Sequence, residues 1–355
     1  MKKGFFAFAD TKHSLGIRFL TFWIYFVLYL FAFNRSAYSD EIDNAVQKAR
    51  TAQGTIVIKC SPGGTVEGTV SLEDGLKNLK SGMSLYLFPE NYNPKELVIL
   101  EQDNIIIEGD GSGSECYLPL IVYGKDCIVR NIHLRSLEAG DITVVDSKIW
   151  RLLITNGGKR VKAVIFNSCM RGLSIYADKS EIMLRESTIL NSREPTETAN
   201  AEQAWRYGTS IHHDFYYNMV SFGNIATKGE VFFEKCIIYS GSGIFGTCVK
   251  GKSLELTLEE NLIFFKKALI STGKDKMFVA LKELGDFFKV RLKGNNILKE
   301  PVFKKALDTK SYWQLYTNNL TLTDTSPGYG KGLGANMGAK DMPVKRTVDK
   351  DKKKI

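Results

Sequence analysis

The feature that most constrains the fold is a five-residue pattern that returns along the chain from about residue 81 onward. Each copy has two mostly polar residues, a variable residue and two mostly apolar residues, and an alternating, strand-like segment precedes it. The copies are RNIHL at 130, DSKIW at 146, NSCMR at 167, ESTIL at 186, EKCII at 234, EENLI at 259 and GNNIL at 294. Most copies follow one another after about 20 residues, and an irregular period of this length with strand chemistry is typical of a coiled parallel sheet. We therefore expect an all-β protein, a right-handed parallel β-helix.

In such a coil each strand bonds to the strands above and below it, so like residues recur in columns. The alignment puts Cys169 and Cys236 in the same position, which predicts that both belong to one inward column of small apolar residues. A β-sandwich or barrel would also give many short strands, but its hairpins would leave frequent Asn-Gly or Asp-Gly turns. The chain has few such dipeptides, so the stacked coil is the preferred fold.

Two segments resemble the pectate-lyase-like superfamily of β-helix proteins. The first is SLEDGLKNLKSGMSLYLFPENYNPKELVILEQDNIIIEGDGSGS at 71–114, with a short helix, a strand ending in Pro-x-x-Tyr and a Gly-rich corner. The second is TSPGYGKGLGANMGA at 325–339, similar to the Ser-Pro and Gly-Ala end of that superfamily. The helix is expected to have an apolar face formed by Leu72, Leu76 and Leu79. Ser71 and Asp74 are expected to cap its N-terminus.

The resemblance covers roughly residues 71–339 and implies a binding surface as well as a fold. In the proteins that this chain resembles, polysaccharides lie along a groove on the outside of one parallel sheet, between loops inserted in the coil. The expected partner is therefore a polysaccharide or a cell-surface glycan.

The first 39 residues have the form of an export signal. Arg18 precedes an uncharged apolar run at 19–33, and Ala37 and Ser39 provide a small-x-small cleavage site. A helix of that run is roughly 22 Å long, whereas the hydrocarbon core of a bilayer is roughly 30 Å thick. We expect cleavage after Ser39 and a periplasmic, cell-surface or extracellular location. An uncleaved membrane anchor is the alternative.

The remaining chain divides into three expected parts. Residues 40–70, which contain EIDNAVQKAR with apolar residues at helical spacing and then the strand-like TIVIK, are expected to cap the N-terminal end of the coil. Residues 71–340 form the parallel β-helix domain, and residues 341–355 form a basic, disordered tail.

The net charge of +9 lies mostly at the two ends of the chain, in residues 1–39 and in KRTVDKDKKKI at 345–355. The body between them is nearly neutral, so it lacks the basic face that nucleic-acid binding requires. A membrane contact is expected only through the N-terminal segment, if that segment is not cleaved.

The cysteine pattern argues against a disulfide scaffold and against a zinc or haem site, because no two cysteines form C-x-x-C. Most lie in apolar runs, where a free thiol is a small buried hydrophobe, and the pairing of one or two of them stays open. No metal site is predicted, although acidic turn residues leave Ca²⁺ open as a cofactor. The cysteines are Cys60, Cys116, Cys127, Cys169, Cys236 and Cys248.

The candidate site combines a polar insertion, NSREPTETANAEQAWRYG at 191–208, with the motif SIHHDFYYN at 210–218. Long loops in compact domains are usually functional or disordered. On a strand, alternation would bury His213 and direct His212, Asp214 and Tyr216 outward, because the opposite register would bury a carboxylate. Adjacent histidines then point to opposite faces and do not share a metal. The expected catalytic residues are His212, Asp214, Tyr216 and Arg206, and the expected substrate-binding residues are Trp205, Arg193, Glu197 and Glu202.

Two reactions fit this set of residues. A polysaccharide lyase needs a base, for which His212 or Tyr216 is available, and a positive group such as Arg206, Arg193 or a bound cation to stabilise the enolate. A glycoside hydrolase needs two carboxylates, which Asp214 and the glutamates at 194, 197 and 202 could supply. In either case aromatic side chains can stack on sugar rings.

The chain departs from the active families of this fold in its motifs. It lacks the Asn-Thr-Asp, Gly-His-Gly and Arg-Ile-Lys signatures of polygalacturonase-like hydrolases and the Arg-x-Pro-x-x-Arg of many pectate lyases. The alternative function is therefore a non-catalytic cell-surface or envelope scaffold for adhesion, in which SIHHDFYYN is only an aromatic strand.

Overall fold

The computed structural model describes residues 40–88, 92, 98–109, 111, 116–155, 160–175, 180–191, 220–222, 229–240, 244–248, 254–265, 267–272, 275–279, 283, 286, 289–304 and 322–334. The expected signal segment and the basic tail lie outside these residues. The chain divides into two compact units, Met1–Ala45 and Val46–Ile355, and the architecture below is that of the second unit. Within the described ranges, no helix combines the length and apolar character that crossing a membrane requires.

The first large sheet, sheet A, contains ten strands, and all neighbouring strands in it are parallel. In spatial order they are β1 (Val57–Cys60), β2 (Ser84–Leu87), β4 (Ile106–Gly109), β6 (Cys127–Arg130), β8 (Ile142–Val145), β10 (Lys162–Phe166), β12 (Ser180–Arg185), β15 (Gly229–Glu234), β18 (Leu254–Glu259) and β22 (Lys289–Lys293).

The second sheet, sheet B, contains twelve strands and is parallel except for its last pair, β20 and β21. Its main path is β21 (Asp275–Val279), β20 (Lys267–Thr272), β17 (Ile244–Cys248), β14 (Val220–Phe222), β11 (Cys169–Ile175), β9 (Lys148–Ile154), β7 (His133–Ala139), β5 (Cys116–Val122) and β3 (Val98–Leu100). A branch from β11 contains β13 (Thr188–Asn191), β16 (Ile237–Ser240) and β19 (Leu262–Phe264).

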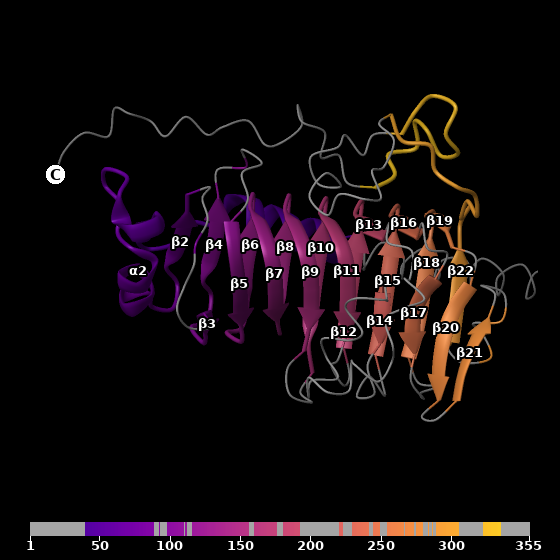
Figure 1. Ribbon diagram of the computed structural model, residues 1–355, viewed down its shortest axis with the longest axis horizontal. Coiled ribbons are helices and arrows are strands. Elements are labelled where there is room, and N and C mark those ends of the chain that lie inside the picture. The colour runs from indigo at the N-terminus through magenta and orange to yellow at the C-terminus, as the bar shows by residue number, and fades with distance from the viewer. Residues whose placement is uncertain are drawn as a thin grey trace, which may run out of the picture. The chain divides into compact units, whose positions relative to one another are not determined.

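Through the middle of the chain, successive strands alternate between the two sheets, and along the main path of each sheet the strands follow the sequence order (Figure 1). From β4 to β12, every even-numbered strand joins sheet A and every odd-numbered strand joins sheet B. Two large parallel sheets connected in this way fit a parallel β-helix-like fold. The described residues are mostly β with few helices, which is consistent with the prediction of an all-β protein.

Sheet B bends, so its strands face two directions. The first part of β11, at Cys169 and Met170, pairs with β13, whereas the second part, from Leu173 to Ile175, pairs with β14. The bend is marked in β7, where two residues that are not buried, instead of one, separate the buried Leu134 from the buried Leu137. Sheet B therefore has a first face, continued by β13, β16 and β19, and a second face, continued by β14, β17 and β20.

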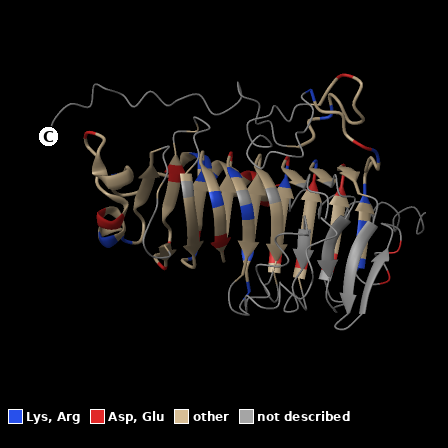
Figure 2. Cartoon of the chain, viewed as in Figure 1, with Lys and Arg blue, Asp and Glu red and all other residues tan. Residues whose placement is uncertain are grey.

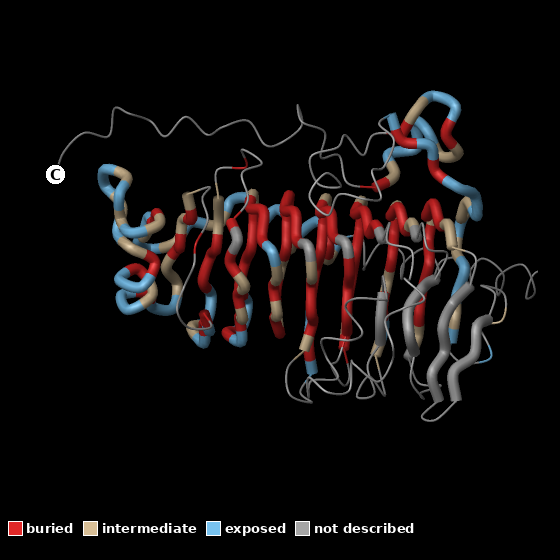
Figure 3. Tube along the Cα trace, viewed as in Figure 1, coloured by how far each residue is buried: buried red, intermediate tan, exposed pale blue. Residues whose placement is uncertain are grey.

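The interior between the sheets is filled by aliphatic side chains in stacked columns. One column in sheet A runs through Val129, Val144, Ile165 and Leu184 to Phe233, and all five are fully buried. Figure 3 shows burial along most of the central strands. This column is the repetition that the sequence alternation predicted.

The turn between sheet A and the first face of sheet B has two residues and the same backbone conformation in six successive copies. Its first residue has a positive φ of 44° to 55°, which favours Asn and Asp over most other side chains. The six residues are Asn131, Asp146, Asn167, Glu186, Lys235 and Glu260. These turns are what the five-residue pattern in the sequence encodes.

The second residue is apolar in the first turn, where it is Ile132, and in the other five turns it belongs to a buried polar column. The amide of Ser147 donates to the hydroxyl of Ser168 (3.2 Å), and the amide of Ser168 donates to the hydroxyl of Ser187 (3.2 Å). Each hydroxyl donates in turn to the carbonyl two residues earlier, at 2.8 to 3.0 Å. The column continues with the Cys236 amide, which donates to the side-chain oxygen of Asn261 (2.8 Å). We call this column, from Ser147 to Asn261, the turn ladder.

The turn ladder corrects one detail of the sequence alignment. Cys169 pairs with Thr188, which pairs with Ile237, so Cys169 lies one position after the level of Cys236. The expectation that the two cysteines share a column is wrong. The alignment started the copies at 130, 234 and 259 on a charged strand residue, one position before the turn residue that the backbone repeats.

The expected helix near residue 75 is α2 (Leu72–Asn78), and its cap is confirmed: the Ser71 hydroxyl accepts from the Asp74 amide at 3.1 Å. Gly75 faces β1 so closely that an added Cβ would lie 2.3 Å from the Cys60 sulfur. The TIVIK segment contributes β1, the first strand of sheet A. The residues before it are helical over 40–51, while their role as a cap stays a prediction.

Candidate functional site

The eight expected site residues lie outside the described residues, so their geometry is not assigned. They belong to the segment 192–219, which connects two described strands. The chain enters this segment after β13, in the first face of sheet B, and leaves it at β14, in the second face. Both strands pair with β11, so the ends of the insertion are held at the bend of sheet B.

The outer surface at the same bend has two described arginines. Arg135 in β7 is exposed and Arg151 in β9 is half-buried. Ser136, next to Arg135, is in register with Arg151, so the two guanidinium-bearing residues lie on adjacent strands. Figure 2 shows basic positions on β7 and β9 in the face turned to the viewer. Leu152, which follows Arg151, is two strand spacings from Val220 at the end of the insertion, roughly 10 Å.

Tyr123 and Glu138 provide a polar pair on the second face of sheet B. The Tyr123 hydroxyl donates to a carboxylate oxygen of Glu138 at 2.6 Å. Burial, the hydrogen bond to Glu138 and the charge of that carboxylate raise the pKa of Tyr123 to about 12. The phenol therefore stays protonated at neutral pH, so Tyr123 can donate a hydrogen bond or stack on a ligand but is no general base.

A second group of functional residue types lies in the first face of sheet B. His133, Lys148 and Cys169 are in register on three adjacent strands, and all three are buried. Burial, with a smaller effect of Lys148, lowers the pKa of His133 to about 4. Burial also raises the pKa of Cys169 to about 12 although Lys148 acts in the opposite direction. A neutral imidazole and a protonated thiol on either side of Lys148 are a structural arrangement, since a nucleophilic cysteine requires a lowered pKa.

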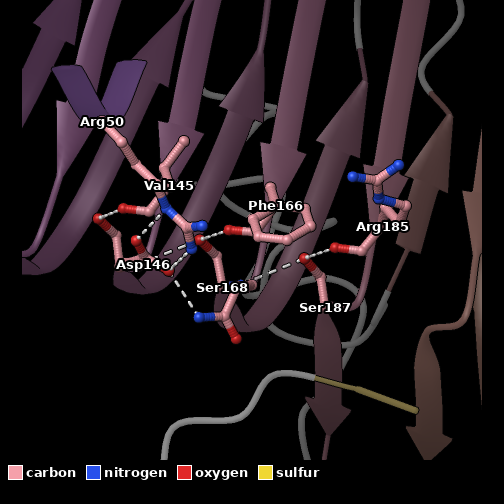
Figure 4. A network of polar contacts seen from close by, with 9 residues as sticks. Arg50, Val145, Asp146, Phe166, Ser168, Arg185 and Ser187 are labelled. Atoms are coloured by element: carbon pink, nitrogen blue, oxygen red, sulfur yellow. Dashed lines mark hydrogen bonds and ion pairs between the residues drawn. The ribbon is translucent and has the colours of Figure 1, made fainter. Parts of the chain in front are cut away.

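A polar network surrounds Asp146, in the turn after β8 (Figure 4). Arg50, from the helix over 40–51, donates to both carboxylate oxygens at 2.8 and 3.0 Å, and the side-chain amide nitrogen of Asn167 donates to one of them at 2.6 Å. The Arg50 and Arg185 guanidinium groups each lie 5.1 Å from the centre of the Phe166 ring. The carboxylate is committed to these contacts, so the network fastens the helix to the turn rather than forming a reaction centre.

A second contact between the helix over 40–51 and sheet A lies at the end of β6, the strand next to β8. Arg130, which is almost fully buried, donates to the Ala49 carbonyl at 2.6 Å and forms an ion pair with Glu108 at 2.6 Å. Sequence reasoning missed Arg50, Arg130 and Asp146, because nothing local in the sequence links a helix to a turn almost a hundred residues away.

Metal binding has no described candidate. Among the side chains that the structure describes, no group of three or more His, Cys, Asp or Glu residues is placed to hold a metal ion. The expectation about Ca²⁺ was tied to acidic turn residues and stays open.

The sequence matches no protein-family model, and neither the curated proteins nor the solved structures include a match to it. The resemblance to pectate-lyase-like proteins therefore rests on the segments that suggested it and on the two parallel sheets. The two parallel sheets agree with the β-helix-like fold that the resemblance implies, and they give no information about an activity.

Proposed function

We propose that this protein is an exported right-handed parallel β-helix, a solenoid of residues 71–340, that binds a polysaccharide on the outer face of sheet B. Residues 1–39 would direct export, and the segments at 40–70 and 341–355 would be its cap and basic tail. In this proposal the glycan lies across the bend of sheet B, between the strands there and the segment 192–219, which contains most of the polar insertion and the motif SIHHDFYYN.

The observation that supports the proposal most is the position of the ends of the insertion. Val220 pairs with Leu173 of β11, and β13, which ends at Asn191, pairs with the first part of β11 at Thr188 and Ile189, so the two ends adjoin the two faces that meet at the bend. Arg135 and Arg151 lie along the same bend, on the strands before β11. The described ends of the segment and the two arginines thus come from separate parts of the sequence to one part of sheet B, as the residues of ligand sites commonly do.

The chemistry that follows depends on the insertion. A lyase would use His212 or Tyr216 as base, with Arg206 or Arg193 neutralising the enolate, whereas a hydrolase would use Asp214 with Glu197 or Glu202. Trp205 would stack on a sugar ring in either reaction. Guanidinium groups bind carboxylates through paired hydrogen bonds, so Arg135 and Arg151 favour a uronate-containing polymer over a neutral one.

The test is a panel of uronate-containing and neutral polysaccharides, scored by affinity electrophoresis for binding and by new reducing ends and unsaturated products for activity. We expect Arg151→Ala to weaken binding of the uronate polymers by about tenfold, the effect of one lost charged hydrogen bond. Lys59→Ala is the matched control, because Lys59 is an exposed basic residue on β1, in the other sheet. Equal binding of both variants would contradict the assigned surface.

The second candidate is a non-catalytic envelope scaffold, and one observation favours it. The serine hydroxyls of the turn ladder are fully buried and donate to backbone carbonyls. Their polar groups therefore hold successive turns of the chain together and are not available to a ligand. A panel on which no polysaccharide binds or reacts would select the scaffold.

A further inference from the structure

The last strand of sheet A, β22, has one edge that no other described strand covers. All five of its residues pair with β18, from Glu255↔Lys289 to Glu259↔Lys293. In the part of the chain that the structure describes, no strand pairs with the opposite edge of β22. An edge of this kind presents a row of backbone groups that can accept a further strand.

The backbone register identifies which residues form this edge. The Lys293 carbonyl accepts from the Glu260 amide, at 3.4 Å, so the backbone groups of Lys293 are directed to the β18 side. Along a parallel strand the direction alternates from residue to residue. The amides and carbonyls of Val290 and Leu292 are therefore directed away from β18, toward the uncovered edge.

Apolar side chains in and after β22 extend the row of core residues but are partly exposed. Val290 packs against the buried core, but Leu292 is 58% exposed although it is in register with the buried Leu258. Leu298 and Val302, shortly after the strand, are 56% and 46% exposed. Figure 3 shows β22 as mainly exposed or intermediate, in contrast to the central strands. An added strand would cover the Leu292 side chain.

Charge limits which strand can be added. The residues of β22 that alternate with Val290 and Leu292 are all basic: Lys289, Arg291 and Lys293. The neighbouring strand is complementary, since Glu255 contacts the Lys289 amine at 3.2 Å and the Arg291 guanidinium at 2.5 Å. A second copy of β22 would place basic residues opposite basic residues, and like charges on adjacent strands are destabilising.

We propose that the open edge of β22 is a docking site for an extended segment of another protein in which acidic and apolar residues alternate. The segment adds to sheet A as its next strand, with main-chain hydrogen bonds to Val290 and Leu292, apolar side chains over Leu292 and carboxylates beside the basic column. The alternation Leu-Glu-Leu-Thr-Leu-Glu of β18 is the pattern that fits.

The test uses the full chain and a synthetic peptide, SLELTLEE, which copies residues 253–260. We expect the peptide to bind saturably and to slow hydrogen exchange at the amides of Val290 and Leu292, which exchange fast without it. A peptide with lysine in place of the first two glutamates should not bind. Leu292→Ser should weaken binding by about tenfold, because it removes the apolar contact while altering only an exposed side chain.

Three outcomes would overturn the proposal. Slow exchange at Val290 and Leu292 without peptide would mean that the chain itself covers the edge. Equal binding of the two peptides would remove the charge argument. Dimerisation in sedimentation that Leu292→Ser abolishes would identify a second copy of the chain as the occupant. The proposal does not depend on polysaccharide binding and can fail separately from it.

Discussion

At the scale of single residues, His133 shows how burial decides between a structural and a chemical role. Its imidazole lies in β7 beside Lys148, and its pKa is lowered from 6.5 to about 4. The folded state therefore holds this side chain neutral where the unfolded chain would protonate it. Between pH 6.5 and pH 4 the unfolded state binds more protons, so the stability that the neutral imidazole provides is lost as pH falls through that range.

We expect His133→Gln to flatten the acid side of the stability curve. The wild-type free energy of unfolding should fall by up to about 3 kcal/mol more than that of the variant between pH 6.5 and pH 4. Urea denaturation at several pH values, followed by circular dichroism, measures the difference. Parallel curves for the two proteins would show that His133 is not held neutral by the fold.

Residues also mark where sequence reasoning reached its limit. The Ser71 cap was predictable because its partner, Asp74, lies three positions away. The contacts of Asp146 with Arg50 and of Arg130 with Ala49 were not, since each joins residues more than 80 positions apart. Charged side chains that reach across a fold leave no periodic signal in the sequence.

At the scale of elements, the turn ladder is the unit that repeats. The Ser168 hydroxyl accepts from the Ser147 amide and donates to the Phe166 carbonyl, so it satisfies two buried backbone groups. Cys236 occupies the equivalent position two copies later, and its thiol donates to the Glu234 carbonyl at 3.3 Å. In the copies from Ser147 to Cys236 the position thus holds a small donor, whether a hydroxyl or a thiol.

We therefore expect two substitutions in the turn ladder to differ in effect. Ser168→Ala should lower the free energy of unfolding by about 1–3 kcal/mol, because it leaves a buried amide without its acceptor. Cys236→Ser should change it by less than about 1 kcal/mol, since serine already fills this position in three other copies. Chemical denaturation measures the free energy of unfolding of both variants. Equal losses would contradict the conclusion that a hydroxyl and a thiol are interchangeable at this position.

The strand pattern was recoverable from sequence because the inward columns repeat the same apolar residue types. The exact alignment of the copies with one another was not recoverable, as Cys169 and Cys236 show. Polar residues occur both in the turn and in the strand position just before it, so the sequence does not mark where the turn begins. Lys235 takes the turn conformation although lysine seldom has a positive φ, so its identity gave no indication of the backbone there.

At the scale of the whole molecule, the fold buries its thiols instead of linking them. The five cysteines that the structure describes in full are free and buried: Cys60, Cys116, Cys127, Cys169 and Cys236. Burial raises the pKa of the thiols of Cys60 and Cys127 to about 11 and of Cys169 and Cys236 to about 12. These thiols are small core side chains of low reactivity.

We expect a thiol reagent at pH 8 to leave these five cysteines unmodified in the native protein and to modify them all after denaturation. A reducing agent should leave the melting temperature unchanged. Mass spectrometry of peptides from the two samples distinguishes the sites. Rapid native modification of Cys169, or a melting temperature lowered by reduction, would contradict the buried arrangement.

The contact between Arg50 and Asp146 can form only after the ribosome has made both residues, so it fixes the order of two steps in folding during synthesis. The two residues are 96 positions apart, and a ribosome that adds roughly 5 to 20 residues per second needs roughly 5 to 20 seconds to make that length of chain. During this interval the helix has been made but the turn that holds its end has not. The helix must therefore wait for a segment that is made later, and until then it is exposed to any chaperone or export factor that meets the growing chain.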